Sequence, residues 1–204
     1  MLANPLPPLH LTADNDKAVV IRPRPDQPAS GLVLMQEPRT GSTADEPSEI
    51  SDELVLDGQF LADHGYLALA THQDPPPTLA SRIDRLIPAK STLRPGHLVI
   101  DPAPGQVTTS NTSHLVILFS KPVALENYLN EFQGLLSRGT KLLVLLSYRT
   151  RAEYDAALAA VNPSLRPQLF PPFDVLGKNA ELSLRQQQRE AALAFFDRWL
   201  RGER

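Results

Sequence analysis

The fold class is decided by residues 114–146, which read HLVILFSKPVALENYLNEFQGLLSRGTKLLVLL. His114–Phe119 and Lys141–Leu146 are compact apolar runs without alternation, typical of strands that are buried on both faces of a sheet. Between them, apolar residues recur at helical spacing from Leu125 to Leu136, and Gly139 follows as a helix terminator. A strand, a helix and a second strand in this order predict a parallel pair with a right-handed crossover.

The same alternation continues on both sides of this unit. Further strands are predicted at Lys17–Ile21 (as an edge strand), Gly31–Met35, Tyr66–Ala70, His97–Ile100 and Arg166–Phe170. Further helices are predicted at Ser51–His64, around Leu79–Ile87, at Arg151–Val161 and from Ser183 onward. The pattern favours an α/β fold with a doubly wound, mostly parallel sheet and helices on both faces. Residues 1–16 are predicted to be an irregular N-terminal arm, and residues 17–204 a single domain.

The last predicted helix has its own signals. Ser183 begins it, and Gln186 stands at the capping-box position. We expect its buried face to consist of Leu184, Ala191, Phe195 and Trp199.

Composition excludes several classes of protein. The chain has 204 residues with 42% hydrophobic residues, which suits one domain with a substantial core. Its net charge is −3 and its basic residues are scattered, so no nucleic-acid partner is expected. The absence of cysteine excludes disulfides, thiolate zinc sites and a cysteine nucleophile, and it fits a cytoplasmic protein. No apolar run approaches the ~20 residues that span a bilayer, and residues 1–8 do not resemble a signal peptide.

Four stretches, in order, resemble the dienelactone hydrolase branch of the α/β-hydrolases. They are GLVLMQEPRTG at 31–41, FLADHGYLALAT at 60–71, KLLVLLSYRT at 141–150 and residues 169–201, which end with ALAFFDRWL at 192–200. The resemblance implies a nucleophile at a sharp turn after a strand, a histidine base and an acid.

The positions that the resemblance assigns to catalysis have lost their chemistry. The nucleophile turn corresponds to Asp101-Pro102-Ala103-Pro104-Gly105, so Ala103 occupies the place of the nucleophile and Pro104 lacks the N–H that an oxyanion hole needs. The acid falls at Thr150 and the histidine near Asp174, and no histidine follows His114. Residues 106–113 are short and polar where the family has a long helix. Glu37, Asp101, Ala103, Thr150 and Asp174 would then line a vestigial pocket, with no catalytic residue and no metal or cofactor.

Several other groupings offer alternative sites. Ser110, His114 and Asp101 are the residue types of a triad, and His64 and His72 flank one predicted strand as metal ligands would. Arg138, Lys141, Arg149 and Arg151 could collect an anion, and Phe195, Phe196, Trp199 and Leu200 could form a partner surface. A solvated surface and an ordinary core are the plainer readings of the last two groups.

The sequence therefore favours a non-catalytic α/β-hydrolase-like protein that acts as a binding or scaffolding module. We expect it to form a homodimer, bind a protein partner or hold a small molecule in the vestigial cleft. The alternative is a hydrolase of esters or lactones with a rearranged site, in which Asp101, Glu37, Asp174 or His114 act as acid–base groups.

Overall fold

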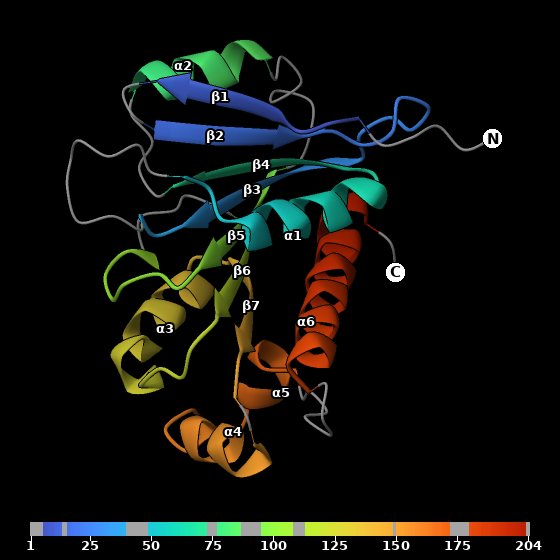
Figure 1. Cartoon of the computed structure of the whole chain (residues 1–204). Coiled ribbons are helices and arrows are strands. Elements are labelled where there is room, and N and C mark those ends of the chain that lie inside the picture. Colours follow the sequence, from blue (N-terminus) through green and yellow to red (C-terminus); the bar gives the residue numbers. More distant parts are fainter. Residues whose placement is uncertain are drawn as a thin grey trace. The chain divides into compact units, whose positions relative to one another are not determined.

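The computed structural model describes residues 6–13, 16–39, 49–72, 77–86, 95–107, 113–148, 150–171 and 180–202. The chain forms two compact units, Met1–Leu98 and Val99–Arg204. The strands of the described residues form a mixed, mostly parallel sheet in the order β1-β2-β4-β3-β5-β6-β7 (Figure 1). The predicted α/β class is confirmed.

The first unit is built on four strands and two helices. The strands are β1 (Leu9–Ala13), β2 (Asp16–Ile21), β3 (Gly31–Glu37) and β4 (Tyr66–His72). The helices are α1 (Asp52–Asp63) and α2 (Pro77–Leu86). β3 and β4 are parallel, whereas β1–β2 and β2–β4 are antiparallel. Leu79 and Ile83 of α2 pack on one face of these strands with Val20, Leu32 and Leu69.

Two expectations at the N-terminus were wrong. Leu9–Ala13 form a strand within the segment expected to be irregular, because Leu9 to Ala13 pair with Val20 to Asp16 of β2. β2 is consequently not at an edge, since β1 and β4 flank it. The β1 strand was missed because a five-residue segment carries little periodic signal of its own.

Helix α1 shows how local signals and packing combine. Its N-cap is Ser51, whose hydroxyl accepts a hydrogen bond from the N–H of Leu54, and Gly65 follows its end with φ of 87°. Gly58 would be unfavourable by helix propensity alone. A Cβ at Gly58 would lie 2.3 Å from Cδ1 of Ile21, so the glycine permits close approach of the helix to the strands.

The second unit continues the alternation of strands and helices. Its strands are β6 (His114–Phe119) and β7 (Lys141–Leu146), which are parallel and in register from His114–Lys141 to Phe119–Leu146, and β5 (Pro95–Ile100) crosses the boundary between the units. The helical segments are η3 (Leu125–Asn127), α3 (Leu129–Ser137), α4 (Arg151–Leu158), α5 (Arg166–Leu169), α6 (Ala180–Phe196) and its continuation η4 (Asp197–Arg201). In Figure 1, α3 and α6 lie on opposite faces of β6 and β7.

The prediction of a strand at Arg166–Phe170 was wrong. Residues Arg166–Leu169 form the short helix α5, with a proline in its first turn. Proline has no N–H to donate to a sheet ladder but is tolerated at the first helical positions, where the N–H has no partner anyway. β7 is therefore the last strand of the described sheet.

The expected buried face of α6 was also wrong, except at Leu184. The buried residues follow a four-residue spacing: Leu184, Gln188, Ala192, Phe196 and Leu200. Ala191, Phe195 and Trp199 lie on a neighbouring, half-buried stripe. Apart from Gln188, both stripes are apolar, so the spacing of apolar residues alone could not separate them. The helix begins at Ala180 rather than at Ser183, and the amide of Gln186 donates to Glu190 instead of forming a capping box.

Candidate functional site

The turn that follows β5 contains a residue with an uncommon backbone conformation. Asp101 has φ of 43°, the one positive value for a non-glycine residue among the described residues. Its N–H donates to the carbonyl of Leu118 at 2.9 Å. A non-glycine residue in this region is uncommon, and such residues gather at functional turns. The strained residue directly after the strand is thus Asp101, two positions before Ala103.

The carboxylate of Asp101 is already engaged. It accepts the N–H of Ser120 at 2.8 Å, and the hydroxyl of Ser120 donates to its second oxygen. Ser120 directly follows β6, so the two residues join neighbouring loops at the carboxyl ends of the strands. Ser120 was not among the predicted site residues, because no local sequence pattern links it to Asp101.

The N–H groups of this turn are either missing or used. Pro102 and Pro104 have no N–H to offer. The N–H of Ala103 donates to Oε1 of Gln106 at 3.0 Å, and that of Gly105 donates to Oε1 of Glu131 at 2.5 Å. The part of the turn that the structure describes therefore presents no pair of free N–H donors to a developing oxyanion.

Tyr128 fixes the turn from the side of α3. Its hydroxyl donates to the carbonyl of Pro102 at 2.9 Å, and its ring packs on Phe119 and Phe132. Burial, followed by the charges of Glu131 and Asp101, raises the pKa of Tyr128 above its usual value. Residues 101–107 contain no α-helix, and residues 108–112 lie outside the described residues together with the candidate Ser110.

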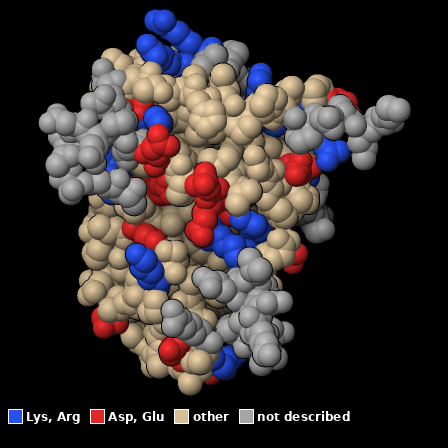
Figure 2. All heavy atoms as spheres, viewed as in Figure 1, with Lys and Arg blue, Asp and Glu red and all other residues tan. Residues whose placement is uncertain are grey.

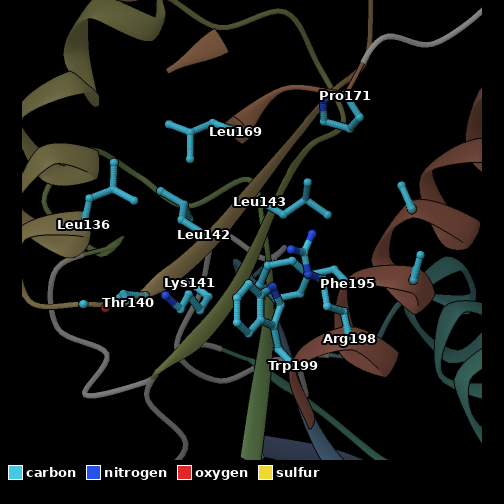
Figure 3. Close-up of a pocket in the computed structure, with 13 residues that line it drawn as sticks. Leu136, Thr140, Lys141, Leu142, Leu143, Leu169, Pro171, Phe195, Arg198 and Trp199 are labelled. Carbon is cyan, nitrogen blue, oxygen red and sulfur yellow. The ribbon is translucent and has the colours of Figure 1, made fainter. Parts of the chain in front are cut away.

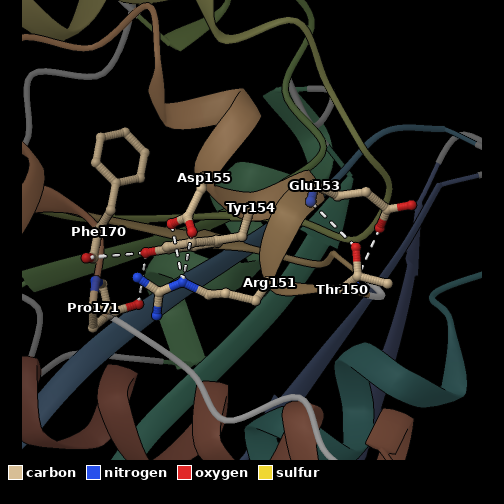
Figure 4. A network of polar contacts seen from close by, with 7 residues as sticks. All are labelled: Thr150, Arg151, Glu153, Tyr154, Asp155, Phe170 and Pro171. Carbon is tan, nitrogen blue, oxygen red and sulfur yellow. Dashed lines mark hydrogen bonds and ion pairs between the residues drawn. The ribbon is translucent and has the colours of Figure 1, made fainter.

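Thr150, the expected acid position, caps a helix. Its hydroxyl accepts the N–H of Glu153 at 3.2 Å, and the carboxylate of Glu153 accepts the N–H of Thr150 at 3.2 Å (Figure 4). Arg151 pairs with Asp155 in the same helix, and the hydroxyl of Tyr154 donates to the carbonyls of Phe170 and Pro171. Each of these side chains serves the local structure of α4 and α5.

Glu37 has a similar structural role at the start of a helix in the first unit. It is 8% exposed and accepts both the N–H and the hydroxyl of Ser51, at 2.7 and 2.6 Å. Since Ser51 is the N-cap of α1, this carboxylate anchors the start of that helix. Asp174, the position matched to the histidine, lies outside the described residues.

The structure does not bring His114 to Asp101. His114 is the first residue of β6, whereas Asp101 bonds to Leu118 and Ser120 at the other end of that strand. Five residues of extended chain span roughly 17 Å. The alternative grouping of Asp101 with His114 is therefore wrong.

Two other predicted groupings, the metal ligands and the anion site, can be compared with the structure. Among the described residues no cluster of three or more His, Asp or Glu side chains could hold a metal ion. Nδ1 of His64 lies 2.7 Å from the carbonyl of Phe60 at the end of α1, as expected for a histidine at a helix terminus. Lys141 and Arg151 stand at opposite ends of β7, so they do not form one anion site.

The surface carries both signs of charge. On the face shown in Figure 2, lysine and arginine side chains are interspersed with acidic ones. None of the helices in the described residues is long and apolar enough to cross a bilayer.

Gln188 is a polar residue that the sequence analysis overlooked. It is 3% exposed, and its amide donates to the hydroxyl of Ser147 at 3.0 Å and to the carbonyl of Leu146 at 3.4 Å. A glutamine between Leu184 and Ala192 at four-residue spacing was the available signal, because a polar residue in a buried stripe needs a partner.

Comparison with known proteins identifies the architecture. No family model matches the sequence, and no curated protein does either. The acylaminoacyl peptidase of Pyrococcus horikoshii has a TM-score of 0.55 at 14% identity, covering 98% of this chain and 43% of the peptidase. Est1E of Butyrivibrio proteoclasticus has a TM-score of 0.52 at 13% identity, covering 93% of this chain and 98% of Est1E.

A third structure is comparable in length to this chain. XC6422 of Xanthomonas campestris, an α/β serine hydrolase without a lid, has a TM-score of 0.50 at 10% identity, covering 97% of each chain. At such identities the likeness concerns the fold and not the chemistry. The strand order and these likenesses together show that the chain has the α/β-hydrolase fold.

Proposed function

We propose that this chain is a non-catalytic protein with the α/β-hydrolase fold, a degenerate relative of the dienelactone hydrolases, and that it works as a binding or scaffolding module. The observation that carries the proposal is the state of the turn after β5. Acyl transfer in this fold needs an N–H from the residue after the nucleophile. That residue is Pro102 if Asp101 holds the position and Pro104 if Ala103 holds it, so neither register supplies the donor.

The other positions that the resemblance assigns to catalysis support the same proposal. Ala103 has no nucleophilic atom, and Thr150 is occupied as a helix cap. No histidine follows His114 in the sequence, and His114 lies at the far end of β6 from Asp101. We further propose that the protein works in the cytoplasm, because it lacks cysteine, and that it acts through a protein partner or a second copy of itself.

The test is an esterase assay on the purified chain. We expect p-nitrophenyl acetate, p-nitrophenyl butyrate and a five-membered lactone to be hydrolysed no faster than in buffer. Turnover that Asp101→Ala or Ser120→Ala abolishes, while Ser137→Ala leaves it intact, would overturn the proposal. Circular dichroism of each variant checks that the loss is chemical. Ser137 is a suitable control because its hydroxyl only caps the carbonyl of Gly134.

One observation favours the alternative, a hydrolase with a rearranged site. The hydroxyl of Ser120 donates to the carboxylate of Asp101, and a carboxylate can take the proton of a serine that attacks a carbonyl. A fluorophosphonate probe separates the two functions, because it labels only an activated serine. The non-catalytic proposal expects no labelling, and labelling that Ser120→Ala removes would establish the alternative.

A further inference from the structure

A hollow lies beside the amino end of β7, away from the turn discussed above. It has a volume of about 820 Å³, within the range typical of small-molecule sites. A smaller hollow of about 350 Å³, beside α3 and Val161, has no charged residue in its lining. The larger hollow is lined by both apolar and cationic groups, so its lining indicates which kind of ligand would fit.

The wall of the hollow is apolar. Leucines from three elements contribute to it: Leu136 of α3, Leu142 of β7 and Leu169 of α5. Ala191 of the half-buried stripe of α6 also contributes. Phe195 of the same stripe contributes its ring (Figure 3). Such a wall suits the hydrocarbon body of a ligand, which gains by leaving water.

Two cations and an indole lie together at one side of this wall. Nζ of Lys141 lies 4.8 Å from the ring centroid of Trp199, and Cζ of Arg198 lies 5.1 Å from the same centroid. Figure 3 shows the three side chains next to one another. Among the described residues, neither Lys141 nor Arg198 forms an ion pair with a carboxylate, although other arginines of this unit do.

The edge of β7 opposite β6 adds a hydrogen-bonding group. The N–H of Lys141 donates to the carbonyl of Ser113 at 2.8 Å, toward β6. Because successive residues of a strand alternate, the N–H and C=O of Leu142 point to the opposite edge, where the hollow lies.

The burial of β7 decides between a small molecule and an added strand. Strand addition needs several consecutive open edge groups. Val144, Leu145 and Leu146 are each 1% exposed, and Gln188 already occupies the carbonyl of Leu146. Only the first residues of the strand line the hollow, so the opening is long enough for a small ligand and too short for a pairing strand.

We propose that this hollow binds an amphipathic carboxylate, with the carboxylate beside Lys141 and Arg198 and the aliphatic or aromatic body against Leu136, Leu142 and Leu169. Two cations that form no ion pair with a described carboxylate, at the edge of an apolar cavity, match that charge distribution. This inference rests on the hollow alone and not on the turn after β5.

The test uses Trp199, the single tryptophan of the chain, as an internal reporter. The purified protein is titrated with sodium decanoate below its micellar concentration, with 1-decanol and with sodium acetate, by fluorescence and by calorimetry. Decanoate should give saturable one-site binding, decanol binding weaker by about tenfold, and acetate no signal. Equal binding of decanol, or the lack of saturable decanoate binding, would overturn the proposal.

Variants locate the ligand. Lys141→Gln with Arg198→Gln should weaken decanoate binding by about tenfold in calorimetry, and Ala191→Phe should abolish it by filling the hollow. Lys121→Gln is the matched control, since Lys121 is an exposed cation that follows β6 at its other end. Circular dichroism verifies the fold of each variant. If the double variant binds as tightly as Lys121→Gln, the proposal is wrong, whatever the outcome of the esterase assay.

Discussion

In the second unit, described polar groups at the carboxyl ends of the strands are hydrogen-bonded to one another, whereas two cations at the amino end of β7 form no ion pair with a described carboxylate. At the carboxyl ends Asp101 is held by Ser120, Tyr128 bonds to Pro102, and Gln188 bonds to Leu146. At the amino end of β7, Lys141 and Arg198 lie beside the ring of Trp199, and neither forms an ion pair with a carboxylate among the described residues.

This difference shows that a fold does not decide where its open groups lie. α/β folds bind ligands at the carboxyl ends of their strands, where loops converge. Among the described residues, polar groups of these loops bond to one another, and the cations proposed to engage a ligand lie at the amino end of β7. Four measurements test this contrast, from the largest expected effect to the smallest.

The largest effect concerns a half-buried histidine near the amino end of β5. Burial lowers the pKa of His97 to about 4. Its neutral form is favoured in the folded state, so its contribution to stability is complete above the unfolded pKa of about 6.5 and disappears as the pH falls toward 4. We expect a loss of roughly 2–3 kcal/mol between pH 7 and pH 4 from this residue.

Urea unfolding at pH 7, 5.5 and 4 measures this loss. Carboxylates also titrate in this range, so His97→Leu is compared with the wild type at each pH. The difference between the two proteins should shift in favour of His97→Leu at low pH. A difference that stays constant with pH would contradict the assignment.

The next effect tests how Gln188 closes the edge of β7. Gln188→Leu leaves the buried carbonyl of Leu146 without its donor, which should lower the free energy of unfolding by about 2 kcal/mol. Gln186→Leu, on the exposed face of the same helix, should change it by less than about 0.5 kcal/mol. Similar values for both variants in chemical denaturation would mean that the edge is not closed in this way.

A smaller effect is expected at the cap of α4. Thr150→Ala removes the acceptor for the N–H of Glu153 and should cost about 1 kcal/mol. Thr150→Ser retains the hydroxyl and should recover most of that loss. Thermal unfolding of the three proteins checks the order, and an unaffected alanine variant would leave Thr150 free for another role.

The smallest effect concerns the turn after β5. Ser120→Ala removes one exposed hydrogen bond but keeps the N–H of residue 120 on Asp101, so it should cost about 0.5 kcal/mol. A loss of more than about 2 kcal/mol in urea would indicate that the Asp101–Ser120 pair is a main support of the turn.

Local sequence signals predicted most of the elements. The apolar runs of β6 and β7 match the structure residue for residue, and α1 (Asp52–Asp63) lies within the helix predicted at Ser51–His64. These features depend on periodicity and on termini, which are read within one segment. The strand predicted in place of α5 failed because a four-residue segment carries almost no periodic signal.

The contacts of the candidate site could not be predicted from local sequence signals. Asp101 was expected to line a pocket, but its contact with Ser120 joins residues that are far apart in the chain. Likewise, Lys141 and Trp199 are far apart in the sequence. Only folding brings Nζ of Lys141 to 4.8 Å from the ring centroid of Trp199.

The sequence by itself determined the alternation of strands and helices, the absence of any histidine after His114 and the prolines that remove two donors after β5. Each of these is a property of residue type or of local spacing. The tertiary structure alone decided which stripe of α6 is buried, which groups close the carboxyl ends of the strands, and that two cations meet beside an apolar hollow. Those outcomes depend on contacts between distant segments, whose geometry no local pattern encodes.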